Sequence, residues 1–277
     1  MMQHKQFIDN WVESILANPV TKQPCNSDSF EIRNGVVDAR VYLKNSPGYH
    51  AWLDGQDEYE DWAKSDDGYD NKVENHTKEI EYDKPVYDQF EISGDFLDCG
   101  GGVSTVREFL PPDVRSVSLD PYINAPFEVP KARFEAYKSL SSPLNFLAAN
   151  AEFLPFRHQS FDWVHMRSML DHVQVPDLCL KEAHRVLKPG GRFLCLEFSK
   201  VKNEILNKFY QIYFQTIPRI GKLVVGKSEP YEYLINSIED FYSQKEFFEK
   251  IKEHNFTNVS YRNLSGGIVA IHSAWKV

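Results

Sequence analysis

From residue 95 onward, short apolar segments alternate with segments of helical spacing, and this alternation constrains the fold more than any other feature. Strands are expected at residues 96–97, 114–119, 144–149, 161–166 and 192–196, and helices at 105–110 and 177–187. Such alternation of strands and helices predicts parallel strands, because each intervening helix returns the chain to the start of the next strand. The sequence therefore predicts an α/β fold in which helices cover both faces of a parallel sheet.

The last part of the chain has a different pattern. Two strands are expected at residues 258–263 and 268–276, joined by Leu264-Ser265-Gly266-Gly267. This join is too short for a parallel crossover, which needs a dozen or more residues. The final two strands are therefore expected to be antiparallel.

The first 94 residues lack the alternation. Residues 31–42 are typical of a hairpin, because Asn34-Gly35 supplies the positive φ angles that a tight turn needs. Residues 54–81 are dense in Asp, Glu, Asn, Gly and Tyr and are expected to form an irregular or loosely helical connector. We expect a small accessory module at 1–60 that does not extend the main core, a connector with a helical segment at 61–94, and the main domain at 95–277.

Charge and composition exclude several classes of function. The 31 Lys and Arg residues against 40 Asp and Glu leave a net charge of −9, so nucleic acid is not an expected partner. The chain has no apolar run long enough to span a bilayer, and its first residues lack the apolar core of a signal peptide. Four widely spaced cysteines without a CxxC pair predict neither disulfides nor a metal site. These features are typical of a cytoplasmic protein.

The segment Asp98-Cys99-Gly100-Gly101-Gly102-Val103-Ser104 is the strongest local signal for a binding site. Glycines after a strand let the backbone approach a ligand closely, and a helix start offers free N–H groups. The dinucleotide fingerprint is incomplete, because Thr105 stands where its third glycine would fall. Asp98 would repel a phosphate but could help to hold a cationic ligand. A plain tight turn with a capping Asp is the alternative.

Two further polar residues follow the next strands. Asp120 comes about 20 residues after the first glycine, where a carboxylate can accept hydrogen bonds from both ribose hydroxyls. Asn150 could bond an adenine amine, and Ala151 leaves room for the ring, although an ordinary loop Asn is also common at a strand end. Together the three strand ends indicate a nucleoside site without a phosphate clamp.

These motifs resemble the class I S-adenosylmethionine-dependent methyltransferases. The resemblance rests on the glycine segment, Asp120, Asn150-Ala-Glu152-Phe-Leu-Pro-Phe, Ser160-Phe-Asp162-Trp-Val and Arg185-Val-Leu-Lys-Pro-Gly-Gly191. It implies S-adenosyl-L-methionine as cofactor, with Asp98, Gly100, Gly102, Asp120, Asn150, Ala151 and Glu152 in its binding site. Arg167, or less favourably His165, could contact the methionine carboxylate of the donor.

The last two thirds of the chain are similar to the UbiE-type C-methyltransferases of ubiquinone and menaquinone synthesis. The similarity is carried by Leu196-Glu-Phe-Ser-Lys200, Ile217-Pro-Arg-Ile-Gly221, Tyr231-Glu-Tyr-Leu-Ile-Asn-Ser-Ile238 and Asn263-Leu-Ser-Gly-Gly-Ile-Val-Ala-Ile-His272. It implies a Rossmann-like, seven-stranded sheet ending in an antiparallel hairpin. It also implies an apolar cover over a small, lipophilic or aromatic acceptor such as a quinone-like metabolite.

One departure concerns catalysis. Where those enzymes carry Gly-Leu-Arg-Asn-Val, this chain has Met169-Leu170-Asp171-His172-Val173, so that Asp171 replaces the Arg. His172 has a reference pKa suited to proton removal, and we expect His172 as the base with Asp171 orienting it. A loop histidine bonded to the backbone is the alternative.

Other features leave alternatives open. Residues 203–226 are rich in apolar side chains and could be a lid over the acceptor, a face in peripheral contact with a membrane, or a helix packed on the core. The N-terminal segment looks similar to zinc-ribbon modules that have lost their cysteines. An inactive nucleoside-binding partner protein, or a nucleic-acid methyltransferase, is the alternative to a small-molecule methyltransferase.

Overall fold

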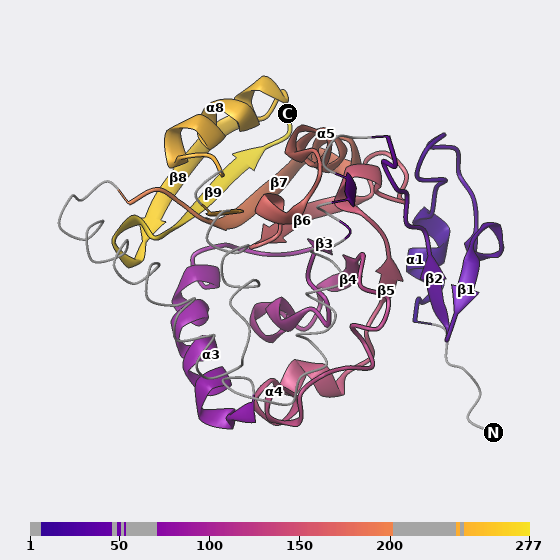
Figure 1. The fold of residues 1–277 in the computed structure, drawn as a ribbon, viewed down its shortest axis with the longest axis horizontal. Coiled ribbons are helices and arrows are strands. Elements are labelled where there is room, and N and C mark those ends of the chain that lie inside the picture. The colour runs from indigo at the N-terminus through magenta and orange to yellow at the C-terminus, as the bar shows by residue number, and fades with distance from the viewer. Residues whose placement is uncertain (1–6, 46–48, 51–52, 54–70, 202–236, 239–240) are drawn as a thin grey trace.

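The computed structural model describes residues 7–45, 49–50, 53, 71–201, 237–238 and 241–277. Its helices, 3₁₀ turns and strands alternate along the chain (Figure 1). The α-helices are α1 (Asn10–Ile15), α3 (Val73–Tyr87), α4 (Lys131–Ala136), α5 (Pro176–Val186) and α8 (Gln244–Glu253). The strands are β1 (Glu31–Arg33), β2 (Val36–Asp38), β3 (Asp95–Cys99), β4 (Arg115–Asp120), β5 (Phe146–Ala148), β6 (Phe161–Arg167), β7 (Leu187–Phe198), β8 (Thr257–Leu264) and β9 (Val269–Trp275). The 3₁₀ turns are η1 (Ser27–Ser29), η3 (Thr105–Phe109), η4 (Lys138–Ser141), η5 (Ala151–Phe153), η6 (Leu170–His172) and η7 (Ser265–Gly267).

The strands of the described residues form one mixed sheet in the order β1-β2-β5-β4-β3-β6-β7-β9-β8. Strands β5, β4, β3, β6 and β7 pair in parallel, as the alternation predicted. Strand β9 pairs antiparallel with both β7 and β8, so the expected terminal antiparallel hairpin is confirmed. The segment at 105–110, expected as a helix, forms only the 3₁₀ turn η3 before Pro111-Pro112.

Alternate residues of each strand point to opposite sides of the sheet. Each side packs against helices in its own apolar cluster. Leu97 of β3 and Val164 of β6 enter a large apolar cluster with side chains of α1, α5 and α8. Phe96 and Trp163, one residue earlier on the same strands, enter a second cluster with Tyr87 of α3. The prediction of helices on both faces is therefore confirmed.

The expected count of seven strands was too low, because the N-terminal hairpin adds two strands to the sheet. Strand β2 pairs in parallel with β5 through Val37 and Leu147, and β1 follows on its outer side. Val36 and Val37 are fully buried. The expectation that this hairpin would not extend the main core was wrong: two adjacent valines can be buried on both faces only when the strand lies inside a larger sheet. The boundaries at residues 60 and 94 stay predictions.

A second contact joins the N-terminal segment to the main domain. The backbone N–H of Ala17 donates to Pro155 O, and that of Arg157 donates to Ile15 O, each at 2.9 Å. Leu16 and Ala17 are fully buried. The segment before the hairpin therefore packs as part of the same core, beside the loop that follows β5.

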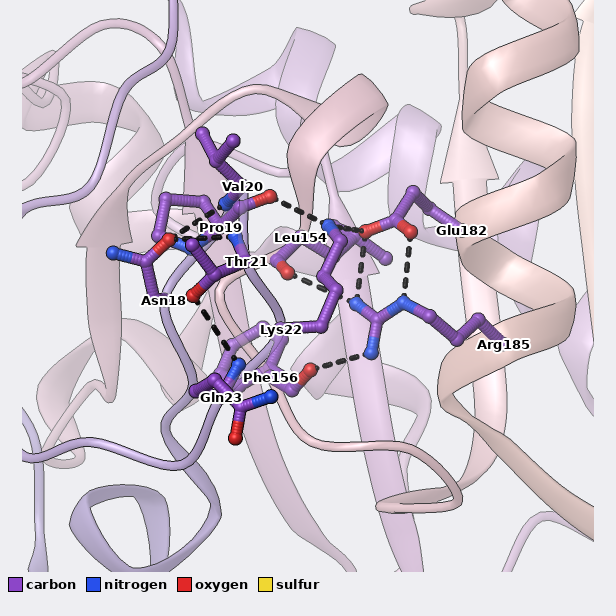
Figure 2. A network of polar contacts seen from close by, with 10 residues as sticks. All are labelled: Asn18, Pro19, Val20, Thr21, Lys22, Gln23, Leu154, Phe156, Glu182 and Arg185. Atoms are coloured by element: carbon purple, nitrogen blue, oxygen red, sulfur yellow. Dashed lines mark hydrogen bonds and ion pairs between the residues drawn. The ribbon is translucent and has the colours of Figure 1, made fainter.

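The turn after α1 is fastened to α5 by a group of charges (Figure 2). The Asn18 side chain accepts the N–H groups of Val20 and Thr21, and Lys22 adopts a φ of +61°. Lys22 Nζ donates to Glu182 Oε2 at 2.5 Å, and Arg185 donates to both oxygens of the same carboxylate. The remaining Arg185 donors reach the carbonyls of Leu154 and Phe156. One acidic side chain thus joins the N-terminal turn, α5 and the loop after β5.

Two further findings bear on the sequence predictions. No helix among the described residues is both long enough and apolar enough to cross a bilayer. In the same part of the chain, no group of three or more His, Cys, Asp or Glu side chains is arranged to hold a metal ion. The likeness of the N-terminal segment to a zinc ribbon stays a prediction.

Glu182 offers a test of how firmly the N-terminal segment is attached. Its side chain is 7% exposed, so Glu182→Ala leaves two cations without their anion in a poorly hydrated place. We expect the free energy of unfolding to fall by about 3 kcal/mol, measured by urea denaturation. Asp88→Asn is the control, because it breaks the exposed pair between Lys84 of α3 and Asp88 just after that helix, and it should cost less than about 0.5 kcal/mol. Equal losses for the two variants would contradict the proposed attachment.

Candidate functional site

The glycine segment follows β3 and bends tightly over the end of the sheet. Gly100 has a φ of +67°, and a Cβ there would lie 2.7 Å from the Met169 side chain. Gly102 has a φ of +51°, and its N–H donates to Asp120 Oδ2 at 3.1 Å. Glycine is required at Gly100 both for the backbone angle and for the close approach of Met169. The loop therefore lies against the ends of β4 and β6.

Asp98 is buried at the base of this loop and is held by two side chains. Its Oδ2 accepts from Ser104 Oγ at 2.7 Å, and its Oδ1 lies 2.8 Å from His165 Nδ1. The other ring nitrogen of His165 lies 3.0 Å from the Tyr87 hydroxyl on α3. These side chains form a continuous polar chain inside the protein. Both Asp98 oxygens contact the protein's own groups, so the carboxylate fixes the shape of the loop.

Asp120 ends β4, and most of its side chain is buried. Its two oxygens accept the N–H groups of Gly102 and Tyr122, at 3.1 Å and 2.9 Å. Both donors are backbone N–H groups, so the orientation of the Asp120 carboxylate is set by the glycine loop and by the residues that follow β4. The carboxylate thus lies directly beside the glycine loop, as the sequence predicted.

Asn150, Ala151 and Glu152 begin the turn after β5, the strand next to β4. Asn150 Oδ1 accepts the N–H of Val41, at 3.1 Å, from the segment that follows the N-terminal hairpin. Glu152 is buried and accepts the N–H of Gln174 at 2.9 Å. Burial raises the pKa of the Glu152 carboxyl in spite of this bond. Asn150 and Glu152 therefore brace segments distant in sequence around the predicted adenine position.

Arg167 and His165 lie on the same face of β6, towards α3. Arg167 forms an ion pair with Asp83 of α3, and His165 contacts Tyr87 one turn further along that helix. His165, considered from sequence as a contact for the donor, is 2% exposed and bonded inside the protein. Arg167 is the more accessible of the two, and its predicted contact with the donor carboxylate stays a prediction.

Asp171 and His172 lie on η6, directly after β6. His172 Nε2 lies 3.5 Å from Asp171 Oδ1, and the ring is 32% exposed whereas the Asp171 side chain is only 3% exposed. Asp171 Oδ2 accepts from Ser237 Oγ at 3.0 Å. The structure therefore brings the two predicted catalytic residues together, with the carboxylate behind the imidazole. The cover at 203–226 lies outside the described residues.

Glu197 of β7 lies beneath this turn and was not among the predicted site residues. It is 1% exposed, and its Oε1 accepts the N–H groups of Met169 and Leu170, each at 3.0 Å. Burial and the neighbouring Asp171 carboxylate raise the pKa of Glu197 to about 8. The sequence signal for such a group is a charged residue within the apolar run at 193–198, because Glu is almost never fully buried without a specific reason.

The sequence also did not predict Asp83, Tyr87 and Val41 as residues of the site. They come from segments that precede the parallel sheet and meet the site only through the fold.

The site as a whole has polar groups at the carboxyl ends of four parallel strands, where ligands of open α/β sheets bind. It combines hydrogen-bond acceptors suited to a nucleoside with an imidazole that can accept a proton.

The model of the ubiE/COQ5 methyltransferase family matches residues 123–276, more than half of the chain. The chain belongs to the ubiE/COQ5 methyltransferase family. The match includes Asn150, Asp171, His172 and Glu197, whereas the N-terminal hairpin, α3 and the glycine segment precede it.

Individual relatives agree with this assignment. The chain is 51% identical over 140 residues to the ubiquinone/menaquinone biosynthesis C-methyltransferase UbiE of Rickettsia bellii, covering 50% of this chain and 56% of the relative. It is 49% identical over 141 residues to UbiE of Brucella canis, covering 50% and 52%. The chain thus spans about half the length of these curated relatives.

Solved structures show the fold. A SAM-dependent methyltransferase from Thermotoga maritima, described as a possible histamine N-methyltransferase, aligns with a TM-score of 0.51 and 17% identity over 82% of this chain and 99% of its own. The structure of PigF with SAH aligns with a TM-score of 0.53 and 13% identity over 84% of this chain and 63% of its own. The α/β, Rossmann-like methyltransferase fold is therefore confirmed.

The Tyr87 hydroxyl provides a test of the polar chain beneath the glycine loop. Tyr87→Phe leaves His165 Nε2 buried without this partner, and burial with Asp83 and Asp98 nearby already raises the pKa of the Tyr87 phenol. We expect the free energy of unfolding to fall by about 1–2 kcal/mol in urea denaturation. Tyr82→Phe on the same helix is the control, because Tyr82 is 79% exposed and its change should stay within about 0.5 kcal/mol. A Tyr87→Phe protein as stable as Tyr82→Phe would contradict this role.

Proposed function

We propose that the protein transfers a methyl group from S-adenosyl-L-methionine to a small, lipophilic or aromatic acceptor. The observation that carries this proposal is the bond between Gly102 N–H and Asp120, which sets the glycine loop beside a carboxylate able to accept the ribose hydroxyls. Family membership supports the same reaction, and the relatives' printed names point to C-methylation in quinone biosynthesis.

Binding of the donor is assigned to the strand ends. Asp120 accepts the ribose hydroxyls, Asn150 and Ala151 border the adenine, and Gly100 and Gly102 let the backbone approach the donor. Asp98 acts through the loop that it holds, since Ser104 and His165 contact its two oxygens. Glu152 supports the adenine side through Gln174. Arg167 pairs with the methionine carboxylate and is oriented for it by Asp83.

Catalysis is assigned to His172 and Asp171. The sulfonium of the donor makes its methyl group reactive, so the protein mainly has to align the acceptor and remove its proton. His172 is partly exposed and can reach an acceptor, whereas Asp171 is buried behind it and can stabilise the charged imidazole. An acceptor carbon, oxygen or nitrogen would all lose a proton by this route. A quinol acceptor would be methylated with Asp171 in place of the Arg that the resemblance to the UbiE-type enzymes implies there.

The remaining parts of the proposal concern the surroundings of the site. Residues 203–226, outside the described part of the chain, would close over the acceptor with an apolar face. A cytoplasmic location with possible contact to a membrane surface suits a lipophilic acceptor. The N-terminal hairpin would brace Asn150 through Val41. An inactive binding protein would show tight S-adenosylhomocysteine binding without turnover.

Asp120 tests donor binding. Asp120→Ala is expected to weaken S-adenosylmethionine binding by about 1.5–3 kcal/mol in calorimetry, because hydrogen bonds to a charged acceptor are lost. Asp120→Asn is the matched variant, which keeps one acceptor oxygen and should lose less. Asp88→Asn, at an exposed site just after α3, should bind as the wild type does. A wild-type protein that does not bind S-adenosylmethionine, or prefers NAD, would refute the proposal.

His172 tests proton removal. With an acceptor that the wild-type protein methylates, His172→Ala is expected to lower kcat by about 100-fold, because general-base catalysis contributes on this scale. The affinity for S-adenosylmethionine should be nearly unchanged, as calorimetry would show. His158→Ala is the control, since His158 lies in a turn between β5 and β6 and has no part in the proposed site. Normal turnover of His172→Ala would mean that His172 is a structural loop residue.

A further inference from the structure

Two carboxylates on neighbouring elements share the space beneath η6. Glu197 of β7 uses Oε1 to accept the N–H groups of Met169 and Leu170, whereas its Oε2 is buried with no hydrogen-bond partner. Asp171, the next residue along, uses Oδ2 to accept from Ser237, and its Oδ1 is buried with no hydrogen bond, 3.5 Å from His172 Nε2. Each carboxylate therefore has one oxygen bound and one oxygen buried without a hydrogen bond.

Ionising both carboxylates at once is costly in this place. Like charges close together in a poorly hydrated place raise each other's cost of ionisation, so the pair keeps one proton. Asp171 has the Ser237 hydroxyl and the adjacent His172 ring to stabilise a negative charge. Glu197 is the more deeply buried of the two. The proton therefore belongs on Glu197.

We propose that Glu197 is a positioning residue that carries the proton of a buried carboxylate pair and so keeps Asp171 ionised towards His172. This inference rests on the proposed methyl transfer for its role in catalysis, whereas the protonation of Glu197 follows from the burial and the hydrogen bonds of the two carboxylates. The neutral carboxyl holds the start of η6 through two backbone bonds without adding a second negative charge. The charge on Asp171 then lies between the Ser237 hydroxyl and the His172 imidazole.

The other titratable groups around Glu197 fit this assignment. Arg167 of β6 lowers the pKa of Glu197 only weakly compared with burial and Asp171. On β7 itself, burial raises the pKa of the Cys195 thiol well above its usual range, so this thiol is neutral. On β9 the residue opposite Glu197 is Ala270, and burial lowers the pKa of His272, opposite Cys195, to about 4.

The proposal has a defined dependence on pH. In an unfolded chain the carboxyl of Glu has a pKa of about 4.3, whereas the pKa of Glu197 in the fold is about 8. The folded protein therefore holds one additional proton between these values. The stability that this group contributes is fully present in acid and is lost as the pH rises through about 8. Ionised Glu197 would then repel Asp171 and disturb η6.

Infrared spectroscopy of the full chain tests the proton directly, through the C=O band of a protonated carboxyl. At about pH 6.5, where exposed carboxyls are ionised, wild-type protein should show such a band, and it should fade as the pH rises through about 8. Glu197→Gln should lack this band. Glu152→Gln is the matched control, because it removes a different buried glutamate that also accepts a backbone N–H, and the band should remain. A Glu197→Gln protein that retains the band would overturn the proposal.

Asp171→Asn provides a second measurement that does not depend on the folding of Glu197→Gln. Removing the charge of the neighbour should move the midpoint of the same band to lower pH. An unchanged midpoint would mean that the two carboxylates do not act as a pair and would refute the inference.

Turnover gives the catalytic arm of the test. Turnover of the wild-type protein should decline as the pH rises through about 8, and Glu197→Gln should remove this decline, whereas Asp171→Asn should lower kcat at every pH. An alkaline decline that persists in Glu197→Gln would overturn the positioning role. If no acceptor is methylated at all, the proposed function fails, while the infrared bands still decide the protonation of Glu197.

Discussion

The buried carboxylate of Asp98 joins the parts of the molecule that make up the site. One oxygen holds Ser104, which adopts a φ of +57° at the end of the glycine loop, and the other holds His165 at the end of β6. Through His165 the same group reaches Tyr87 and hence α3. A buried carboxylate is tolerated only when its oxygens are well bonded, so the loop, the strand and the helix depend on one another. The shape of the loop is therefore a property of the whole domain.

The sequence predicted the central sheet well, because period and spacing are local properties. Alternating apolar segments placed the strands of the parallel sheet, and the short loop between β8 and β9 required an antiparallel pair. The same signal placed Asp98, Asp120 and Asn150 at adjacent strand ends. It could not reveal what these side chains contact, since Val41 and His165 reach them from distant parts of the chain.

The N-terminal hairpin shows where reasoning from local pattern fails. Asn34-Gly35 predicted its turn, and the antiparallel pair β1–β2 forms as expected. Its attachment to β5 depends on pairing between distant strands, for which a single sequence carries no periodic signal. The two adjacent valines of β2 were the available hint, because a free-standing hairpin has no second face to bury them. The net charge also could not predict that Glu182 and Glu197 are buried, because a sum of charges does not say where each acidic side chain lies.

The pairing of β2 with β5 has a consequence for the order in which the protein folds. The partners Val37 and Leu147 are separated by roughly a hundred residues, so β2 leaves the ribosome long before its neighbour exists. Until β5 is made, the valines of β2 have no sheet to join. Once β5 is made, its three apolar residues form an open edge that could pair with another chain. Late docking of the N-terminal hairpin would close that edge, making the first strands synthesised among the last to reach their places.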